Sequence, residues 1–458
     1  MAIRSLNPAT GKLNKEFTEL SDSEISAKIT TADKQFSSWK NTEISDRTEL
    51  LAKLGEVLAK NKEQYVKFMS IEMGKTVMEG RSEIDKCIMG VKYYAEHIAE
   101  MIAPQEVATE FTKSYIRFDP LGVLLAVMPW NFPFWQVLRF AVPVISAGNV
   151  VLLKHASNVP QCALAIEQAF TEAGYPEGVF QTLLIGSSKV EQVVADPRVQ
   201  GGSLTGSSYA GAQFAGNAAK HLKKTLLELG GSDPFIVNSD ADITKAALAA
   251  ASSRLRNVGQ SCNSAKRFLV HKDIAAQFVK EFKEVFAKQI VGDPMSDATN
   301  LGSMVSAEAT AEVQNQFAKS VEMGAKVEFQ AELKLGNELD AKAFCAPAIL
   351  TNVTADMPVW NEEVFGPVAP VMQFSTIEEA IKIANDSEYG LGASVWMADT
   401  TMAEEVAKQL NTGNVFINKM VSSDPRLPFG GIKNSGYGRE LGDFVVKEFV
   451  NIKTVVVV

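Results

Sequence analysis

The chain has few cysteines and histidines, no long apolar run and no excess of basic residues. Its four cysteines, Cys87, Cys162, Cys262 and Cys345, are far apart and form no CxxC pair, and its four histidines do not cluster with them. This scarcity argues against a zinc site, any other bound metal and a disulfide framework. A reducing, cytoplasmic compartment fits such a chain best, because disulfide-stabilised proteins occur in oxidising compartments.

The absence of a basic surplus also limits the partners. The formal net charge is −9 at pH 7, whereas nucleic-acid binding relies on basic patches that neutralise phosphates. No apolar run approaches the roughly 18 residues of a membrane span, and the first residues, MAIRSLNPATGKL, lack the apolar core of a signal peptide. We therefore expect no nucleic-acid partner, no membrane insertion and no signal peptide.

The order of expected elements predicts the fold class. At 458 residues, of which 46% are hydrophobic, the chain exceeds one ordinary core, and we expect two domains. Residues 22–110 read as helical, with leucines at helical spacing in 46–73. From residue 115 onward short apolar runs alternate with helical segments, and the rhythm starts again near residue 230. This alternation predicts an α/β fold with doubly wound, mainly parallel sheets. The expected strands span 115–118, 122–128, 150–153, 179–185, 201–204, 234–237 and 267–271, and the expected helices span 160–173, 188–195, 208–220, 242–255 and 273–288.

The stretch GQSCNSAKR, residues 259–267, sets Cys262 in polar surroundings. Gly259 permits a tight turn, and Lys266 and Arg267 favour the thiolate, which is the reactive form of cysteine. The sulfur is therefore a candidate nucleophile. A buried structural cysteine is an equally good interpretation of these residues alone, because free cysteine is among the most buried residue types.

Two prolines restrict the loop Met128–Pro133, which reads MPWNFP and follows an expected strand. The loop fixes Asn131, whose amide N–H groups are suited to stabilising an oxyanion. For this motif by itself, a cap on the helix that we expect to begin near Pro133 is the better interpretation.

Three further stretches carry candidate functional groups. Glu228 stands in LELGG at an apolar strand end, where burial would raise its pKa toward that of a general base; an exposed glutamate is the alternative. LTGSSYAG contains Gly206 and Ser207 between a strand and a helix, where backbone N–H groups suit a phosphate, although it is not a GxGxxG motif. NEEVFGP places Glu363 and Phe365 at an aromatic turn. Each of these stretches alone also fits an ordinary loop.

Together the five stretches resemble the aldehyde dehydrogenase superfamily. The resemblance covers essentially the whole chain, from NPATG at residues 7–11 to PFGG at 428–431 and SGYGRE at 435–440. Five ordered motifs at family spacing are far more specific than any one of them. The resemblance implies an aldehyde-dehydrogenase-like fold with two doubly wound α/β domains and a small β oligomerisation flap. The expected dinucleotide-binding domain comprises 1–113 and 122–228, the catalytic domain 229–430, and the flap with the C-terminal strand 114–121 and 431–458.

The resemblance also implies roles in catalysis. Cys262 would attack the aldehyde carbonyl and form a thiohemiacetal, whose oxyanion the Asn131 amide and the Cys262 backbone N–H would bind. Collapse of the oxyanion would expel hydride to the nicotinamide and leave a thioester, which Glu228 would hydrolyse by activating water. Covalent attachment holds the reacting carbon in place through both steps.

For the cofactor, the resemblance implies Lys154 near the adenine ribose, Ser207 at the pyrophosphate and Glu363 at the nicotinamide ribose. The complete set of implied cofactor-binding residues is Trp130, Lys154, Ser157, Gly206, Ser207, Glu363 and Phe365.

The chain departs from many NAD-preferring members of the superfamily, which read Lys-Pro-Ser-Glu where this chain reads Lys154-His-Ala-Ser157. A glutamate at the last position would repel the 2′-phosphate of NADP, and a serine would not. Lys154 and His155 add positive potential. We therefore predict that NADP is accepted and preferred, with NAD as the other candidate cofactor. The alternative is that Ser157 weakens NAD binding without creating a phosphate site.

Two arginines point to the substrate. Arg139 lies eight residues after Asn131, and Arg256 lies six before Cys262, so both are expected to face the tunnel to the cysteine. An arginine in an apolar entrance is costly unless it binds an anion, and its planar fork suits a carboxylate. Members that oxidise succinate semialdehyde to succinate, as in 4-aminobutyrate breakdown, carry arginines at both places. The resemblance therefore implies that activity, with Ser261 as a further substrate-binding residue. Alternatively, either arginine caps a helix or pairs with a surface acid.

The stretches 132–135 and 422–424 resemble the same group. Other hypotheses remain: a broad-specificity dehydrogenase for other short aliphatic aldehydes, a non-redox thiol hydrolase or acyltransferase, and a catalytically idle homologue. We also expect a homodimer or homotetramer. The nearly all-valine run Thr454–Val458 needs another strand, from this chain or another subunit, because an exposed apolar edge promotes aggregation.

Overall fold

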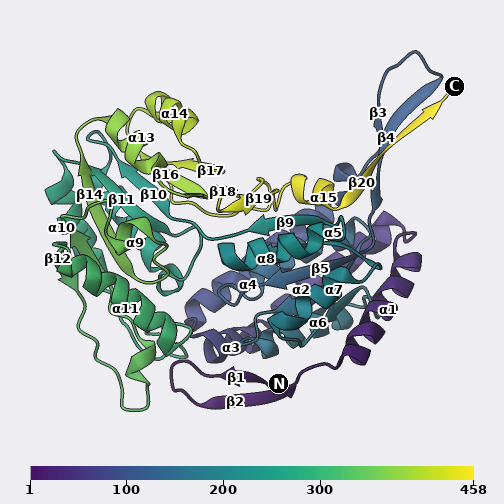
Figure 1. Ribbon diagram of the computed structural model, residues 1–458, viewed down its shortest axis with the longest axis horizontal. Helices are drawn as coiled ribbons and strands as arrows, with labels where there is room; N and C mark the ends of the chain where they lie inside the picture. Colours follow the sequence, from purple (N-terminus) through teal and green to yellow (C-terminus); the bar gives the residue numbers. More distant parts are fainter. Residues whose placement is uncertain (1) are drawn as a thin grey trace.

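The computed structural model describes residues 2–458 and consists of two α/β lobes and a projecting β arm (Figure 1). Two separate clusters of buried apolar side chains fill the lobes. One cluster is built from residues 25–229 with a few from 391–450, and the other from residues 235–410. No helix within the described residues is long and apolar enough to cross a membrane.

The first lobe is built on a sheet of six strands in the order β19-β9-β8-β5-β6-β7, in which all strands but β19 are parallel. Both faces of its central strands are buried, which explains the continuous apolar runs in the sequence. The strands are β5 (Val123–Met128), β6 (Val150–His155), β7 (Phe180–Thr182), β8 (Val199–Thr205), β9 (Lys224–Glu228) and β19 (Gly436–Tyr437).

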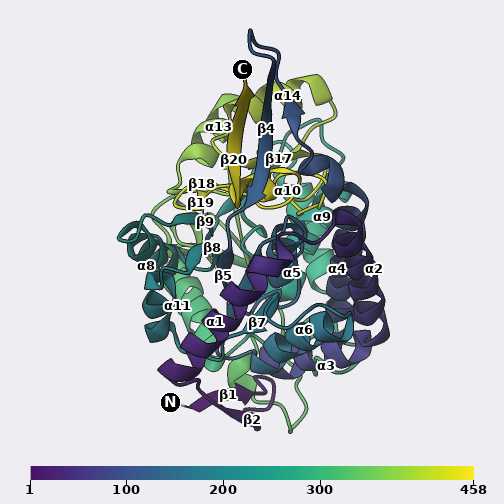
Figure 2. The same ribbon diagram turned by 90° about the vertical axis from the view of Figure 1, so that its right-hand side faces the viewer.

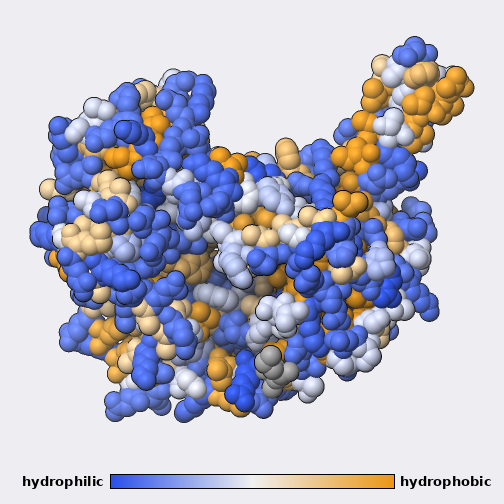
Figure 3. All heavy atoms as spheres, in the orientation of Figure 1, coloured by the Kyte–Doolittle hydropathy of each residue, from blue (hydrophilic) through white to orange (hydrophobic). Residues whose placement is uncertain are grey.

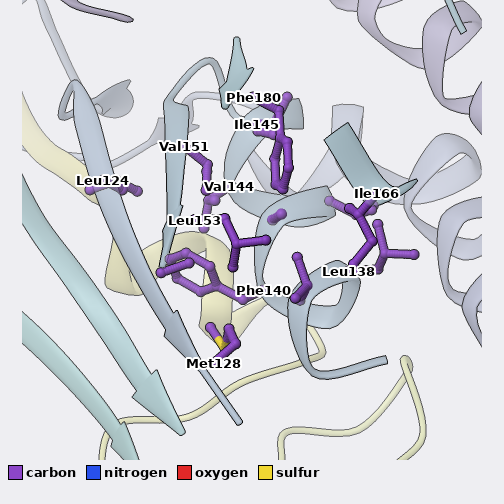
Figure 4. Packing of buried hydrophobic residues seen from close by; sticks show 14 of the residues in the cluster. Leu124, Met128, Leu138, Phe140, Val144, Ile145, Val151, Leu153, Ile166 and Phe180 are labelled. Atoms are coloured by element: carbon purple, nitrogen blue, oxygen red, sulfur yellow. The ribbon is translucent and has the colours of Figure 1, made fainter. Parts of the chain in front are cut away.

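Helices cover this sheet. Helix α1 lies across β5, β6 and β7 (Figure 2), α5 packs on β5 and β6, and α8 packs on β8 and β9. All twelve residues of α5 are buried, Arg139 included, and Figure 4 shows Leu138 and Phe140 of α5 within the core beside strand residues such as Leu153. The helices are α1 (Asp22–Trp39), α2 (Ile44–Lys60), α3 (Lys62–Met73), α4 (Val77–Met101), α5 (Trp135–Ser146), α6 (Pro160–Glu172), α7 (Val190–Ala195) and α8 (Ser208–Ala219), with a 3-10 turn η1 (Ser187–Lys189).

The second lobe is built on a sheet of seven strands in the order β12-β13-β14-β11-β10-β16-β17, parallel except for β12. Its strands are β10 (Asp233–Val237), β11 (Ala265–His271), β12 (Lys326–Gln330), β13 (Ala348–Thr351), β14 (Val368–Phe374), β16 (Gly392–Trp396) and β17 (Asn414–Ile417). Its helices are α9 (Ile243–Leu255), α10 (Ala275–Phe286), α11 (Ala307–Glu322), α12 (Pro358–Asn361), α13 (Ile377–Asn385) and α14 (Thr400–Gln409), with the 3-10 segments η2 (Arg256–Gly259) and η3 (Ala341–Ala343). These two sheets confirm the expected doubly wound α/β fold.

The C-terminal valine strand pairs as expected. β20 (Val450–Val457) runs antiparallel to β4 (Lys113–Pro120), which also pairs with β3 (Gln105–Glu106). The three strands form an arm that projects from the body (Figures 1 and 2), and apolar side chains are exposed along it (Figure 3), including Ile452 and Val456. The remaining elements are β1 (Ala2–Leu6), β2 (Leu13–Thr18), β15 (Tyr389–Gly390), β18 (Ile432–Lys433) and α15 (Phe444–Glu448).

The structure differs from the expected elements in three places. The helical stretch 22–110 ends at Met101, and its segment 46–73 is two helices that meet at Asn61. Asn61 leaves the helical conformation, with φ −97° and ψ 10°, and its side-chain amide donates to Glu172 of α6 over 2.9 Å. The strand expected at 179–185 is only Phe180–Thr182. The expected domain boundaries stay a prediction.

Candidate active site

The first sheet gathers several sequence-predicted residues along one edge. β5, β6, β8 and β9 run in the same direction, so the segments at their carboxyl ends are neighbours. Trp130 and Asn131 follow β5, Lys154 and Ser157 lie at the end of β6, and Ser207 follows β8. Ligands of open α/β sheets bind at this edge. The edge is therefore a candidate dinucleotide site.

A cavity of about 210 Å³ lies at this edge. Glu363 accepts a hydrogen bond from the Gly231 N–H at 3.0 Å and lies 3.4 Å from Lys266 Nζ. The ring of Phe365 meets that of Trp130 edge-on, with centroids 5.9 Å apart. The cavity is lined by Pro129, Trp130, Asn131, Thr205, Gly206, Ser207, Leu229, Gly230, Cys262, Glu363 and Phe365.

Ser207 stands at the N-terminus of α8, where its hydroxyl accepts a hydrogen bond from the Ala210 N–H at 3.3 Å. The N–H groups of the first helical turn have no partner within the helix and carry partial positive charge. Because this twelve-residue helix begins at the cavity wall, its N-terminus suits a pyrophosphate. The residues present therefore fit a dinucleotide.

At the adenine end of the implied site, Lys154 is buried and Ser157 is exposed. Neither residue lines the cavity of about 210 Å³. Burial lowers the pKa of Lys154. The expected positive contribution of His155 is wrong. Its ring is enclosed between the carbonyls of Met128 and Pro133, and burial lowers its pKa to about 4, so the ring is neutral at pH 7.

A second cavity, of about 300 Å³, also reaches Cys262. Arg139 of α5, Arg256 of η2 and Ser261 all contribute to its wall, as the sequence predicts for the substrate tunnel. The full lining is Glu79, Ser82, Glu83, Lys86, Phe132, Trp135, Gln136, Arg139, Arg256, Ser261, Cys262, Asn263 and Ser423.

Cys262 lines both cavities. It is partly exposed, whereas Cys87, Cys162 and Cys345 are buried. A sulfur at the wall shared by two cavities can be reached by a small molecule from one side and by a planar cofactor ring from the other. The structure therefore favours the nucleophile over the buried structural cysteine.

The segment that precedes Cys262 has an unusual backbone. Asn257, Val258 and Gly259 have φ values of 52°, 57° and 77°, the left-handed region that residues with side chains seldom adopt. A side chain on Gly259 would collide with the Gly366 carbonyl, which explains the glycine. Backbone strain of this kind is concentrated at functional sites.

The two basic residues after Cys262 differ in their effect on the sulfur. Lys266 Nζ donates to the carbonyls of Ser261 at 2.9 Å and of Cys262 at 2.7 Å, and so holds the loop. Arg267 donates to the carbonyls of Ser232, Ile383 and Ala384, away from the sulfur. Burial raises the pKa of the Cys262 thiol to about 11, although Arg139 and Lys266 lower it. Lys266 therefore favours the thiolate, as expected, but burial outweighs its effect, and Arg267 is turned toward other partners.

Asn131 is held from several directions. Its carbonyl accepts from Lys75 Nζ at 2.8 Å and from the Asn257 amide at 2.9 Å, while its own Nδ2 donates to the Gln260 carbonyl at 3.2 Å. The second Nδ2 hydrogen has no protein acceptor among residues 2–458, and Asn131 and Cys262 line the same cavity. The amide and the cysteine thus share one cavity, as an oxyanion donor requires.

The alternative role of Asn131 as a helix cap is wrong. The N–H groups of Phe134 and Trp135, at the start of α5, donate instead to Glu83 Oε1 at 2.9 and 3.0 Å. Glu83 also forms a fully buried ion pair with Lys75. The sequence analysis missed both residues, because Lys75 in the segment between α3 and α4 and Glu83 on α4 belong to a stretch whose charged residues resemble an ordinary solvated surface.

Glu228 is buried but lines neither cavity. Its Oε2 lies 3.6 Å from a terminal nitrogen of Arg139, whose Nε forms an ion pair with Glu440. Burial raises the pKa of Glu228 well above 4.5, and nearby Glu440 raises it further, against the opposing effect of Arg139. The prediction of a buried carboxyl group with a raised pKa is confirmed, and the alternative of an exposed glutamate is wrong.

The two arginines differ in their partners. Arg139 pairs with an acid, as one alternative proposed, but the pair is buried and not at the surface. Arg256 has no carboxylate oxygen within 4 Å in the described chain, and it donates to Met420 Sδ at 3.3 Å. Arg256 therefore presents a charge to the cavity that no carboxylate neutralises directly.

Comparison with known proteins shows the family. The model described as "Aldehyde dehydrogenase family" matches residues 1–455. A Synechocystis sp. (strain PCC 6803) protein named "Probable succinate-semialdehyde dehydrogenase", with NADP(+) specified, is 45% identical over 456 residues, 99% of both chains. "Succinate-semialdehyde dehydrogenase 1" of Mycobacterium tuberculosis (strain H37Rv), also with NADP(+) specified, is 44% identical over 460 residues, again 99% of both. The crystal structure of succinic semialdehyde dehydrogenase from Streptococcus pyogenes with NADP+ matches all of both chains, with a TM-score of 0.96 and 37% identity. The chain belongs to the aldehyde dehydrogenase family.

Proposed function

We propose that this protein oxidises succinate semialdehyde to succinate with NADP as the preferred cofactor. The observation that carries the proposal is the position of Cys262 in the wall shared by a cavity at the dinucleotide edge and a cavity lined by cationic side chains. Relatives at 44% and 45% identity that span the whole chain bear the name of this activity and of this cofactor, which supports the proposal.

In the first step, the Cys262 sulfur attacks the aldehyde carbon and forms a thiohemiacetal. The carbonyl oxygen becomes an oxyanion, which accepts hydrogen bonds from Asn131 Nδ2 and from the Cys262 backbone N–H. Asn131 is fixed before the substrate arrives, so little reorganisation accompanies the development of charge. The proton of the thiol must leave before the attack, because the thiolate is the nucleophile.

When bound, NADP would accept hydride at C4 of its nicotinamide ring, and loss of that hydride from the carbon attached to Cys262 would leave a thioester. The proposed binding residues are those of the dinucleotide edge: Ser207 and Gly206 at the pyrophosphate, Glu363 at the nicotinamide ribose, Trp130 and Phe365 beside that end, and Lys154 with Ser157 at the adenine ribose. The carboxylate of Glu363 is held in place by the Gly231 N–H and Lys266. The loop after β6 carries no acidic residue from 155 to 159, so no like charge opposes a 2′-phosphate there.

In the second step, Glu228 takes a proton from water, which hydrolyses the thioester on Cys262 and releases succinate. The raised pKa of Glu228 suits this role, since a carboxylate with a raised pKa is a stronger base than an ordinary one. In the ligand-free geometry the carboxylate faces Arg139. The step therefore requires its side chain to turn toward the thioester.

Kinetic assays with a panel of aldehydes and saturating NADP or NAD test the proposal. We expect the highest kcat/KM with succinate semialdehyde and NADP. A preference for NAD of about tenfold, equivalent to about 1.4 kcal/mol, would overturn the cofactor assignment. A kcat/KM for butanal that equals the value for succinate semialdehyde would overturn the substrate assignment.

The ion pair between Arg139 and Glu440 favours a second candidate, a dehydrogenase of broader specificity for short aliphatic aldehydes. An arginine already neutralised by a carboxylate contributes less to the binding of another. The aldehyde panel separates the two candidates, because only the first predicts a strong preference for a chain that ends in a carboxylate.

The exposed arm supports a proposal for the association state. We propose a homodimer or homotetramer in which the arm of β3, β4 and β20 contacts a neighbour, since its apolar side chains are exposed in the single chain. Light scattering of the purified protein would test this. Cytoplasmic location and the domain boundaries near residues 113, 122 and 228 also remain proposals.

A further inference from the structure

Lys86 of α4 occupies the cavity of about 300 Å³, and the sequence analysis did not identify it. Its Nζ donates to Ser423 Oγ at 2.6 Å and lies 4.4 Å from the centroid of the Trp135 ring. Trp135 and Ser423 line the same cavity. The ammonium group thus stands in the wall of the cavity with an aromatic face on one side and a hydroxyl on the other.

The hydroxyl of Ser423 is saturated as an acceptor. It accepts one hydrogen bond from Lys86 Nζ and a second from Trp135 Nε1, at 3.1 Å. A serine hydroxyl has two lone pairs and one hydrogen. Because both lone pairs are engaged, the hydrogen is free to be donated, and within residues 2–458 it has no protein acceptor. Lys86 and Ser423 therefore present two donors to one acceptor in the cavity.

The ion pairs of the cavity leave positive charge without a direct partner. The five charged residues in the wall are Glu79, Glu83, Lys86, Arg139 and Arg256. Glu83 pairs with Lys75, and Arg139 pairs with Glu440.

Within the described chain, neither Lys86 nor Arg256 has a carboxylate oxygen within 4 Å. Glu79 accepts from the Asn257 N–H at 2.6 Å, and burial raises its pKa, so its charge is weakened. A partly buried cation without an anionic partner is costly, and binding a carboxylate relieves that cost.

The titration of Lys86 agrees with this geometry. Burial, Arg256 and Arg139 lower its pKa to about 7, while Cys87 and Glu83 act in the opposite direction. The titratable groups that share its cavity are Glu79, Glu83, Arg139, Arg256 and Cys262. A bound carboxylate favours the protonated amine, and the amine loses its proton as the pH rises through about 7 in the empty site.

We propose that Lys86 and Ser423 form the subsite that binds the distal carboxylate of the aldehyde substrate, so that Lys86 is a specificity-determining residue. The inference rests on the proposed function, an ω-carboxylated aldehyde as substrate. It adds Lys86 to the cations of the cavity that recognise the carboxylate, beside Arg256 and beside Arg139, whose charge is shared with Glu440. Ser423 then donates its hydroxyl hydrogen to the same carboxylate.

The substitutions Lys86→Met and Lys86→Arg test the subsite, with Lys92→Met as the matched control. Lys92 is on the same helix and exposed, and pairs only with Glu96 at 3.9 Å. KM and kcat are measured with succinate semialdehyde and with butanal at saturating NADP. We expect Lys86→Met to raise KM for succinate semialdehyde about tenfold or more, equivalent to about 1.4 kcal/mol. For butanal, both kcat and KM should stay unchanged. Lys86→Arg should restore most of the affinity, and Lys92→Met should behave as the wild type.

The pH dependence gives a second readout. Between about pH 6 and about pH 8 the wild-type KM for succinate semialdehyde should rise, since the amine loses its charge, whereas the value for Lys86→Arg should stay flat. Several outcomes would overturn the subsite: an unchanged KM in Lys86→Met, an equal loss with butanal, or a pH profile that Lys86→Arg does not flatten. The proposed function stands in each of these cases, provided that the wild type oxidises succinate semialdehyde. If the wild type does not oxidise this aldehyde, the proposed function itself fails.

Discussion

The substitution Ser157→Glu should change the cofactor preference of the protein. Ser157 is exposed just after β6, three residues beyond Lys154, and no acidic residue lies from 155 to 159. A carboxylate at this position would face the 2′-phosphate that we propose binds beside Lys154. NAD has no such phosphate, and its ribose hydroxyls can donate hydrogen bonds to a carboxylate.

The size of the effect follows from the exposure of the site. Two unit charges at about 4 Å interact by about 1 kcal/mol in water, which is the appropriate limit for an exposed side chain. A phosphate monoester carries about 1.5 to 2 negative charges near neutral pH. The repulsion is therefore about 1.5 to 2 kcal/mol, which corresponds to an increase in KM for NADP of roughly 10-fold to 30-fold.

Steady-state kinetics with succinate semialdehyde and varied NADP or NAD measure this change. Ser45→Glu is a suitable control, because Ser45 is exposed on α2, a helix that contributes no residue to either cavity. We expect the ratio of the two KM values to shift toward NAD only in Ser157→Glu. A KM for NADP that stays within about threefold of the wild type, well under 1 kcal/mol, would refute the placement of the 2′-phosphate.

Three further predictions concern the catalytic centre. Arg139→Ala should raise KM for succinate semialdehyde, because the cavity loses one of its cations, and should also slow the oxidation of butanal, because loss of the cation raises the pKa of Glu228 further and favours its protonated form, which is not a base; an unchanged butanal rate across the pH range would contradict this. Glu83→Gln should lower the melting temperature by destabilising the fold by about 3–5 kcal/mol, since it strips the buried Lys75 ammonium of its partner; a melting temperature equal to that of the wild type would contradict it. Alkylation of Cys262 by iodoacetamide in the cofactor-free protein should accelerate about tenfold per pH unit between about pH 7 and about pH 9, because a thiol with a pKa of about 11 gains thiolate throughout that range; a plateau would show a lower pKa.

Much of the fold was predictable because its strands are buried on both faces. β5 and β6 read as continuous apolar runs, a pattern that few other elements produce. The hairpin of β1 and β2 was not predictable, since β2 reads LNKEFT and is almost entirely exposed. The split of 46–73 at Asn61 was also hidden, because apolar spacing continues through the junction and a long-range hydrogen bond to Glu172 marks it.

The candidate site also has features that the sequence predicts and features that it does not. The positions of Cys262 and Asn131 beside one cavity were predictable from motifs that stand at the ends of elements. Contacts between distant segments were not predictable. Examples are the ion pair of Arg139 with Glu440, 301 residues apart in the sequence, and the hydrogen bond of Lys86 with Ser423. Such pairs depend on how helices pack on the sheets, and no local pattern contains that information.

The central claim is that the sulfur of Cys262 bonds to the carbon that loses hydride. The most direct measurement mixes the Glu228→Gln variant with succinate semialdehyde and NADP, quenches in acid, and locates any acyl group by peptide mass spectrometry. The account predicts a burst of about one NADPH per site together with a succinyl thioester on Cys262, because hydrolysis is slowed while the first step proceeds. NADPH formation without acylation of Cys262, or undiminished turnover by Cys262→Ala, would contradict it.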